Sequence, residues 1–164
     1  MKMKKLFSIL LISASLMTVS QSVFADSPVN EVEVTPYAIG LGDTKAQAVD
    51  IYDGQELNLF LQSAEDEDWF KWTNNTGKGQ FTYGFLNNLG PENTVALGIV
   101  IQYTPSRESE LLIAEPTQKG NPNWSSKIRN VYVPDGATLY LRVKADEYVN
   151  LEQYMLSFGY YHLD

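Results

Sequence analysis

Apolar and polar residues alternate along most of the chain from residue 46 onward. The alternating runs cover residues 57–61, 81–85, 95–103, 139–143 and 154–160. Successive side chains of a β-strand point to opposite faces of a sheet, so a period of two indicates half-buried strands. Segments rich in Gly, Asn, Asp and Pro separate these runs and predict turns. The pattern therefore predicts strands joined by tight connections.

This pattern favours an all-β fold of about eight or nine antiparallel strands. The only helix candidate, residues 44–50, is short, and the chain shows no internal repeat. Many short strands with regularly spaced turns are typical of a β-sandwich or a β-barrel.

The first 25 residues are predicted to be a secretory signal peptide that is cleaved after Ala25. Three lysines lie among the first five residues, and an apolar run of about 14 residues follows them. The alternative is a transmembrane anchor, which needs roughly 20 apolar residues. We therefore expect a secreted, extracellular protein.

Cleavage there leaves 139 of the 164 residues, with 26–42 as a linker or edge strand and 43–164 as one domain. This remainder has nine basic and twenty acidic residues, a net charge of −11. Such a charge repels nucleic acid and anionic lipid, and it suits cations, neutral glycans or basic partners. The chain has no cysteine, which excludes disulfides, cysteine nucleophiles and thiolate zinc sites.

Three segments resemble, in order, parts of the bacterial pre-peptidase C-terminal domain. Residues 66–72 (D-E-D-W-F-K-W) resemble its D-x-D-W-[FY]-x-F strand, and residues 133–143 (V-P-D-G-A-T-L-Y-L-R-V) resemble one of its hairpins. Residues 154–158 (Y-M-L-S-F) are similar to its closing strand. The resemblance covers roughly residues 43–160.

The resemblance implies a single jelly-roll-like β-sandwich that is not catalytic. Domains of this family usually follow a secreted peptidase and bind matrix, substrate or cell surface. The collagen-binding domains of clostridial collagenases are similar in fold, and some of them bind calcium. In those relatives an acidic stretch just before the first strand completes the calcium shell, and Asp43 is the acid that matches it here.

An acidic turn, residues 65–68, runs directly into an aromatic segment and allows three interpretations. The first is a calcium site, because calcium binds six to eight oxygen ligands. Its ligands would be Asp43, Glu65, Asp66 and Asp68. The second is a catalytic pair formed by Glu65 and Asp66, but neighbouring side chains of an extended chain point apart. The third is a solvated turn before a strand that buries Phe70 and Trp72.

Several aromatic residues are expected outside the core, where they could stack on sugar rings or anchor a protein partner. They are Trp69, Trp124, Tyr160 and Tyr161. Alternation places Trp69 on the outward face beside Lys71. The single histidine, His162, lies three residues from the end and supports neither a catalytic triad nor a histidine-rich metal site.

The leading hypothesis is a secreted, non-catalytic binding module, with calcium as its candidate cofactor. Its partner would be an extracellular protein or polysaccharide, and neither nucleic acid nor membrane insertion is expected. The first alternative is a self-assembling protein of the extracellular matrix or surface. A small secreted hydrolase and a peptidase inhibitor or chaperone are further alternatives.

Overall fold

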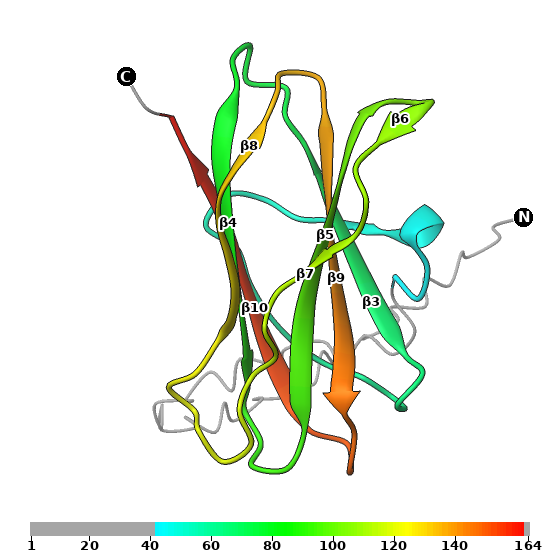
Figure 1. Ribbon diagram of the computed structural model, residues 1–164, viewed down its shortest axis with the longest axis vertical. Coiled ribbons are helices and arrows are strands. Elements are labelled where there is room, and N and C mark those ends of the chain that lie inside the picture. Colours follow the sequence, from blue (N-terminus) through cyan, green and yellow to red (C-terminus); the bar gives the residue numbers. More distant parts are fainter. Residues whose placement is uncertain (1–41, 163–164) are drawn as a thin grey trace, which may run out of the picture. The chain divides into compact units, whose positions relative to one another are not determined.

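The alternating segments form two sheets of a β-sandwich (Figure 1). A computed structural model describes residues 42–162, all within the second of the chain's two compact units, residues 35–164. The strands are β1 (Val49–Asp50), β2 (Glu56–Phe60), β3 (Glu67–Thr73), β4 (Gln80–Asn88), β5 (Thr94–Thr104), β6 (Arg107–Glu108), β7 (Leu112–Ile113), β8 (Ser126–Val133), β9 (Thr138–Glu147) and β10 (Gln153–Tyr161).

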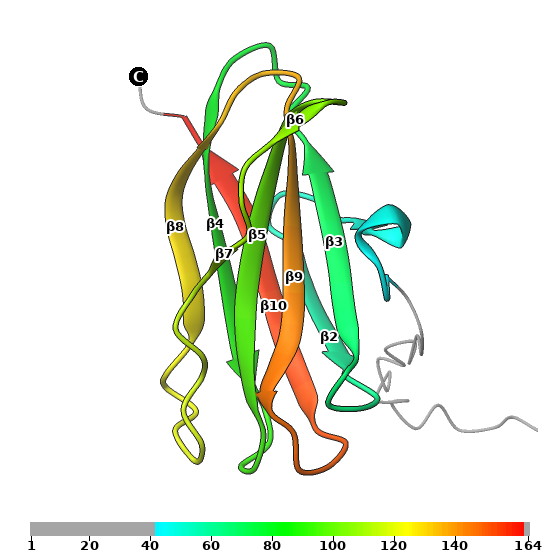
Figure 2. The same cartoon turned by 45° about the vertical axis from the view of Figure 1, so that its right-hand side comes forward.

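The larger sheet has the strand order β1-β3-β9-β5-β6, with β7 also paired to β5. Figure 2 shows β3, β9 and β5 side by side in this sheet. The smaller sheet has the order β2-β10-β4-β8. Every pairing is antiparallel except that of β1 with β3, which is parallel and corrects the expectation of antiparallel strands alone.

The all-β prediction is confirmed, although the strand count differs. The described residues contain ten strands, and three of them, β1, β6 and β7, are only two residues long. Two-residue strands are too short to show a period of two, so the sequence pattern cannot reveal them.

The core lies between the two sheets. Phe70 and Trp72 are buried there, as alternation along β3 predicts, and Trp72 contacts Phe158 from the opposite sheet. Leu57 and Leu59 of β2 pack against the same core. The largest fully buried side chains are Tyr154, Phe70, Phe158, Ile51, Leu86, Leu97, Ile99, Leu139, Leu141 and Leu156.

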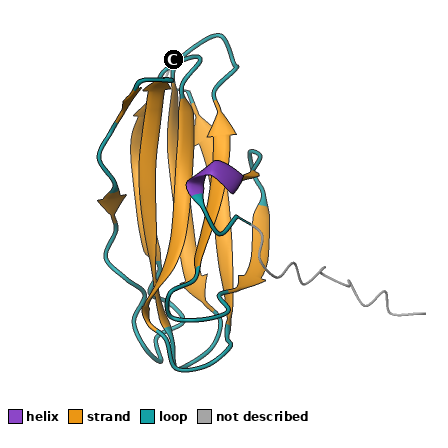
Figure 3. Ribbon diagram, turned by 90° about the vertical axis from the view of Figure 1, so that its right-hand side faces the viewer, coloured by secondary structure: helices purple, strands orange, loops and turns teal. Residues whose placement is uncertain are grey.

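The outer face of the larger sheet is covered in part by the segment that precedes β1. The helix candidate at residues 44–50 proves to be a three-residue 3-10 helix, η1 (Lys45–Gln47), which lies beside β3 (Figure 3). Ala48 packs there against Trp69 and Val100. The Trp69 amide donates to the Gly42 carbonyl at 2.8 Å, and a Cβ at Gly42 would lie 2.6 Å from the Trp69 carbonyl oxygen. This close backbone approach requires glycine.

Along β4 of the smaller sheet, aromatic side chains lie on the solvent side and some polar side chains lie on the core side. Its aromatic residues share one face, as predicted, but that face points outward and is half-exposed. The inward positions include Gln80 and Thr82, both buried. The Gln80 amide donates to the Thr76 hydroxyl, and the Thr82 hydroxyl donates to the Val131 carbonyl. These hydrogen bonds offset part of the cost of burying polar groups, although the side-chain oxygen of Gln80 is buried without a partner in the described region.

The expected signal peptide, residues 1–25, lies outside the described residues, as does all of the expected linker except Gly42. Within residues 42–162, no helix has the length and apolar character needed to cross a membrane.

Candidate functional site

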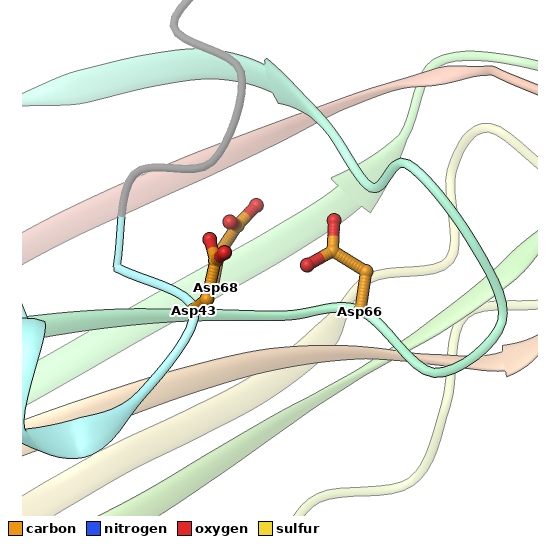
Figure 4. Close-up of side chains that lie close together, drawn as sticks. All are labelled: Asp43, Asp66 and Asp68. Atoms are coloured by element: carbon orange, nitrogen blue, oxygen red, sulfur yellow. The ribbon is translucent and has the colours of Figure 1, made fainter.

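Three of the four carboxylates expected to bind calcium converge in the structure. Asp66 lies in the turn between β2 and β3, Asp68 is the second residue of β3, and Asp43 comes from the segment before η1 (Figure 4). One carboxylate oxygen from each residue lies within 4.8 Å of the others. Glu65 is exposed and does not belong to this group. The geometry therefore supports Asp43, Asp66 and Asp68 as a cluster and separates Glu65 from it.

Local hydrogen bonds fix the shape of this turn. The Asp66 carboxylate accepts from the Gln62 amide at 2.7 Å, and the amide of Glu65 donates to the Ser63 hydroxyl at 3.2 Å. Carboxylates that accept backbone N–H bonds stabilise turns in this way. The turn thus directs Asp66 toward the start of β3 (Figure 4).

Asp68 is the buried member of the cluster, with 5% of its surface exposed. Its carboxylate accepts a hydrogen bond from the Tyr154 hydroxyl of β10. Burial raises the pKa of Asp68 to about 7, and the hydrogen bond from Tyr154 acts in the opposite direction. The negative charges of Asp66 and Asp43 also raise this pKa. Burial likewise raises the pKa of Tyr154 well above its ordinary value, so the phenol keeps the proton that it donates.

The remaining acid of the turn is Glu67, which was not expected to bind calcium. It has a structural role on the face of β3 opposite to that of Asp68. It forms ion pairs with Lys144 at 2.9 Å and Arg142 at 3.3 Å, and the Trp69 indole donates to it. Although burial acts to raise the pKa of Glu67, the bonds from Lys144 and Trp69 lower it overall. Glu67 therefore stays ionised and points away from Asp68.

Two of the aromatic residues expected to contact a ligand are packed inside the protein. Trp69 does face outward from the sheet, but only 8% of its surface is exposed because Ala48 and Leu111 pack against it. The expectation that Trp69 is accessible is therefore wrong. Tyr160 is half-buried, and its ring stacks on Trp72 with centroids 4.7 Å apart.

The other two expected aromatic residues reach the surface. Trp124 and Tyr161 are each 36% exposed. Trp124 lies in the loop before β8, with the Lys127 ammonium 5.8 Å from its ring centre. Tyr161 ends β10, and its hydroxyl donates to the Asn130 side chain at 2.6 Å. They remain candidates for ligand contact.

An aromatic face on the smaller sheet was not identified from the sequence. The aromatic face is defined as the outward side chains of β4, β8 and β10, namely Phe81, Tyr83, Phe85, Tyr132 and Tyr161. Phe81 contacts both Tyr132 and Tyr161, at centroid distances of 5.4 and 5.9 Å. The signal was present in the alternation along residues 81–85, but alternation alone does not say which face is the inner one.

Glycines allow two tyrosines of the aromatic face to lie down on the sheet. A Cβ at Gly159 would lie 2.2 Å from the Tyr83 hydroxyl oxygen, and one at Gly79 would lie 2.1 Å from that of Tyr132. The phenol end of each ring therefore occupies space that any other residue would fill. In this position Tyr132 is 52% exposed and Tyr83 is half-buried.

A shallow hollow of about 270 Å³ opens within the aromatic face. It is lined by Tyr83, Phe85, Arg129, Asn130 and Tyr161. Asn130 has φ of +59°, and the pairing of β4 with β8 shifts register beside it. Such a bulge re-aims neighbouring side chains. The Arg129 guanidinium lies 4.5 Å from the centre of the Phe85 ring.

The chain was compared with protein-family models and with curated proteins, and neither comparison gave a match. The acidic cluster and the aromatic face are therefore the grounds on which a function can be argued.

Proposed function

We propose that this protein is a secreted, non-catalytic binding module that holds an extracellular protein or polysaccharide on its aromatic face. The supporting observation is the outward placement of five aromatic rings on three adjacent strands, with Tyr132 52% exposed. Leaving large apolar rings in contact with water costs free energy that burial would recover. Contiguous exposed aromatic surface is typical of binding sites.

We also propose a jelly-roll-like topology and a relationship to the pre-peptidase C-terminal domain. The first two motif segments lie on β3 and β9, which pair directly, with Trp69 opposite Arg142. The third segment lies on β10, whose Tyr154 bonds to Asp68 of the first segment. The contacts of the first segment with each of the other two support the idea that the three form one structural unit.

Calcium is proposed as a cofactor that stabilises the acidic turn through Asp43, Asp66 and Asp68. With one oxygen from each, three carboxylates supply half or fewer of the oxygens that calcium takes, so backbone carbonyls and water would complete the shell. A bound cation would also offset the repulsion between these neighbouring negative charges.

Self-assembly through edge strands has less support. An edge strand with regular, unpaired backbone groups can recruit a second copy, whereas bulges and charges prevent such pairing. The edge strand β8 has a bulge at Asn130 and carries Lys127 and Arg129. A protein that remains monomeric in sedimentation at high concentration would contradict self-assembly.

Binding can be tested by co-sedimentation of the secreted protein with a panel of insoluble polysaccharides and extracellular matrix proteins. A double variant, Tyr83→Ala with Tyr132→Ala, removes two rings of the aromatic face. The matched control, Leu112→Ala with Ile113→Ala, removes two exposed apolar side chains from β7 of the other sheet. We expect the protein and the control to bind one class of material and the aromatic variant to lose binding. Equal binding by all three proteins, or no binding to any material, would contradict the proposal.

A further inference from the structure

The strands that carry the aromatic face contain no acidic residue, although the chain is strongly acidic. The full chain has 20 acidic residues and a net charge of −8. Strands β4, β8 and β10 have none of these acids, and β8 contributes Lys127 and Arg129. Both cations are exposed and occupy outward positions of β8. On its β8 side the aromatic face therefore carries two cations and no acid, whereas on its β10 side the exposed Glu56 of the neighbouring strand β2 accepts a hydrogen bond from the Ser157 hydroxyl.

These two cations are not neutralised by the protein itself. Five other basic residues of the described region form ion pairs with acids. Within residues 42–162, Lys127 and Arg129 form none, and each instead lies over an aromatic ring, of Trp124 and Phe85 respectively. Cation–π contacts of this kind leave the N–H donors of both groups available for an anion.

The hollow places ring faces and a cation within reach of one ligand. Tyr83, Tyr161 and Arg129 all line it, and the Tyr161 hydroxyl donates to the Asn130 side chain of β8. Sugar rings present a flat face of C–H groups that packs well on an aromatic ring. A planar guanidinium binds a carboxylate through two parallel hydrogen bonds.

We propose that this hollow binds an acidic polysaccharide, a chain of sugars of which some carry carboxylates. A sugar ring would stack on Tyr83, which Gly159 allows to lie flat, while its carboxylate would pair with Arg129 and the next carboxylate with Lys127. This inference rests on the proposed binding function and adds the chemical class of the ligand. It also refines the expectation from net charge, which favours neutral glycans, because the local charge at the hollow is opposite to the total.

Nucleic acid fits this surface less well. Polynucleotides carry one charge per nucleotide, and binding them requires several cations that replace condensed counterions. The aromatic face offers two cations in an acidic protein, which is fewer than such binding requires.

The test compares oligomers of galacturonate, alginate and hyaluronan with neutral forms of the same oligomers in which the carboxylates are methyl esters. Isothermal titration calorimetry on the secreted protein gives each affinity. We expect at least one acidic oligomer to bind about tenfold more tightly than its ester, because a charge-assisted pair replaces a neutral contact. The affinity should fall as salt rises.

Three variants assign the binding to the hollow. Arg129→Gln should lower the affinity for the acidic oligomer toward that for its ester, with Lys127 left as the remaining cation. Arg107→Gln is the matched control, because Arg107 also forms no ion pair in the described region and lies 5.0 Å over the Tyr103 ring, but on the other sheet. It should leave the affinity unchanged. Gly159→Ala should lower the affinity for the acidic oligomer and for its methyl ester alike, because the new methyl group displaces the Tyr83 ring. An unchanged thermal midpoint shows that each variant is folded.

The outcomes separate this inference from the proposed function. Equal affinity for acid and ester, with binding still lost in Gly159→Ala, would overturn the acidic ligand and leave the binding module intact. Preferential binding of single-stranded DNA or of collagen at the same hollow would also overturn it. No binding to any polysaccharide or matrix protein would overturn both proposals.

Discussion

We expect the free energy of unfolding of this protein to contain a contribution from Asp68 that falls as pH rises from 4.5 to 7.5. Replacing Asp68 by asparagine should remove that contribution. Asp68 is buried, and its carboxyl group retains its proton up to a pKa of about 7, against 3.8 in the unfolded chain. Between these two values the folded state binds more protons than the unfolded state. The free energy of unfolding therefore decreases with rising pH across this interval.

The magnitude follows from the two pKa values. Each pH unit over which one proton is bound only in the folded state corresponds to 1.36 kcal/mol. Integrating from pH 4.5 to pH 7.5 with folded and unfolded values of about 7 and 3.8 gives a loss of about 3 kcal/mol. An asparagine side chain has no proton to release, and its amide oxygen can still accept from Tyr154. The variant should therefore equal or exceed the unsubstituted protein in stability at pH 7.5.

Urea denaturation in EDTA at the two pH values measures this difference. EDTA removes bound cations that would favour the ionised carboxylate. Glu67 and Glu152, whose pKa values lie below the ordinary 4.5, begin to lose their stabilising contributions near pH 4.5, but this loss is the same in both proteins and cancels in the difference between them. Glu65→Gln is the matched control, since Glu65 is an exposed acid of the same turn. It should respond to pH as the unsubstituted protein does.

The reasoning fails if the stability difference between Asp68→Asn and the unsubstituted protein is the same at both pH values. That result would mean that Asp68 ionises in the folded state near its ordinary pKa. Water or a rearranged turn would then have to solvate a carboxylate that the structure buries.

Two further predictions concern the acidic cluster and the buried tryptophan. Calcium at about 100 times its dissociation constant should stabilise the protein by roughly 2.7 kcal/mol and raise the thermal midpoint by several degrees. Asp43→Asn and Asp66→Asn should abolish that shift and Glu65→Gln should keep it, whereas a midpoint that is equal in calcium and in EDTA would rule out the calcium site. Trp69→Ala should destabilise the protein by about 3–5 kcal/mol in urea denaturation, because it empties a packed site, while the exposed Trp124→Ala should cost less than about 1 kcal/mol. Equal effects of the two tryptophan substitutions would contradict the packing described for Trp69.

The alternation of residues predicts the strands well but not which face of a sheet is covered. Along β3 it places Phe70 and Trp72 in the core and Trp69 outward, as the structure has them. It could not show that η1 and Ala48 cover Trp69, because that contact joins segments more than twenty residues apart. The residues around a strand position therefore do not reveal whether a distant segment of the chain covers it.

The acidic cluster was partly predictable for a similar reason. A run of acids marks a polar turn, and a resemblance to calcium-binding domains adds Asp43, which the structure places beside Asp66 and Asp68. The sequence could not separate Glu65 from these three residues, because the direction of each side chain depends on the hydrogen bonds of the turn. The aromatic face was missed because two inward positions of β4, Gln80 and Thr82, are polar, and their hydrogen-bond partners lie on other strands and turns.

The strand order also determines when the protein can fold. Strand β10, the last in the chain, lies between β2 and β4, and β9 lies between β3 and β5. Neither sheet has its central strand until nearly the whole chain has been synthesised. Pairings between such distant segments close slowly, since a long loop must first be ordered. A ribosome-bound fragment lacking residues 153–161 would have no complete smaller sheet, so we expect the nascent chain to form its native fold only after β10 has been synthesised.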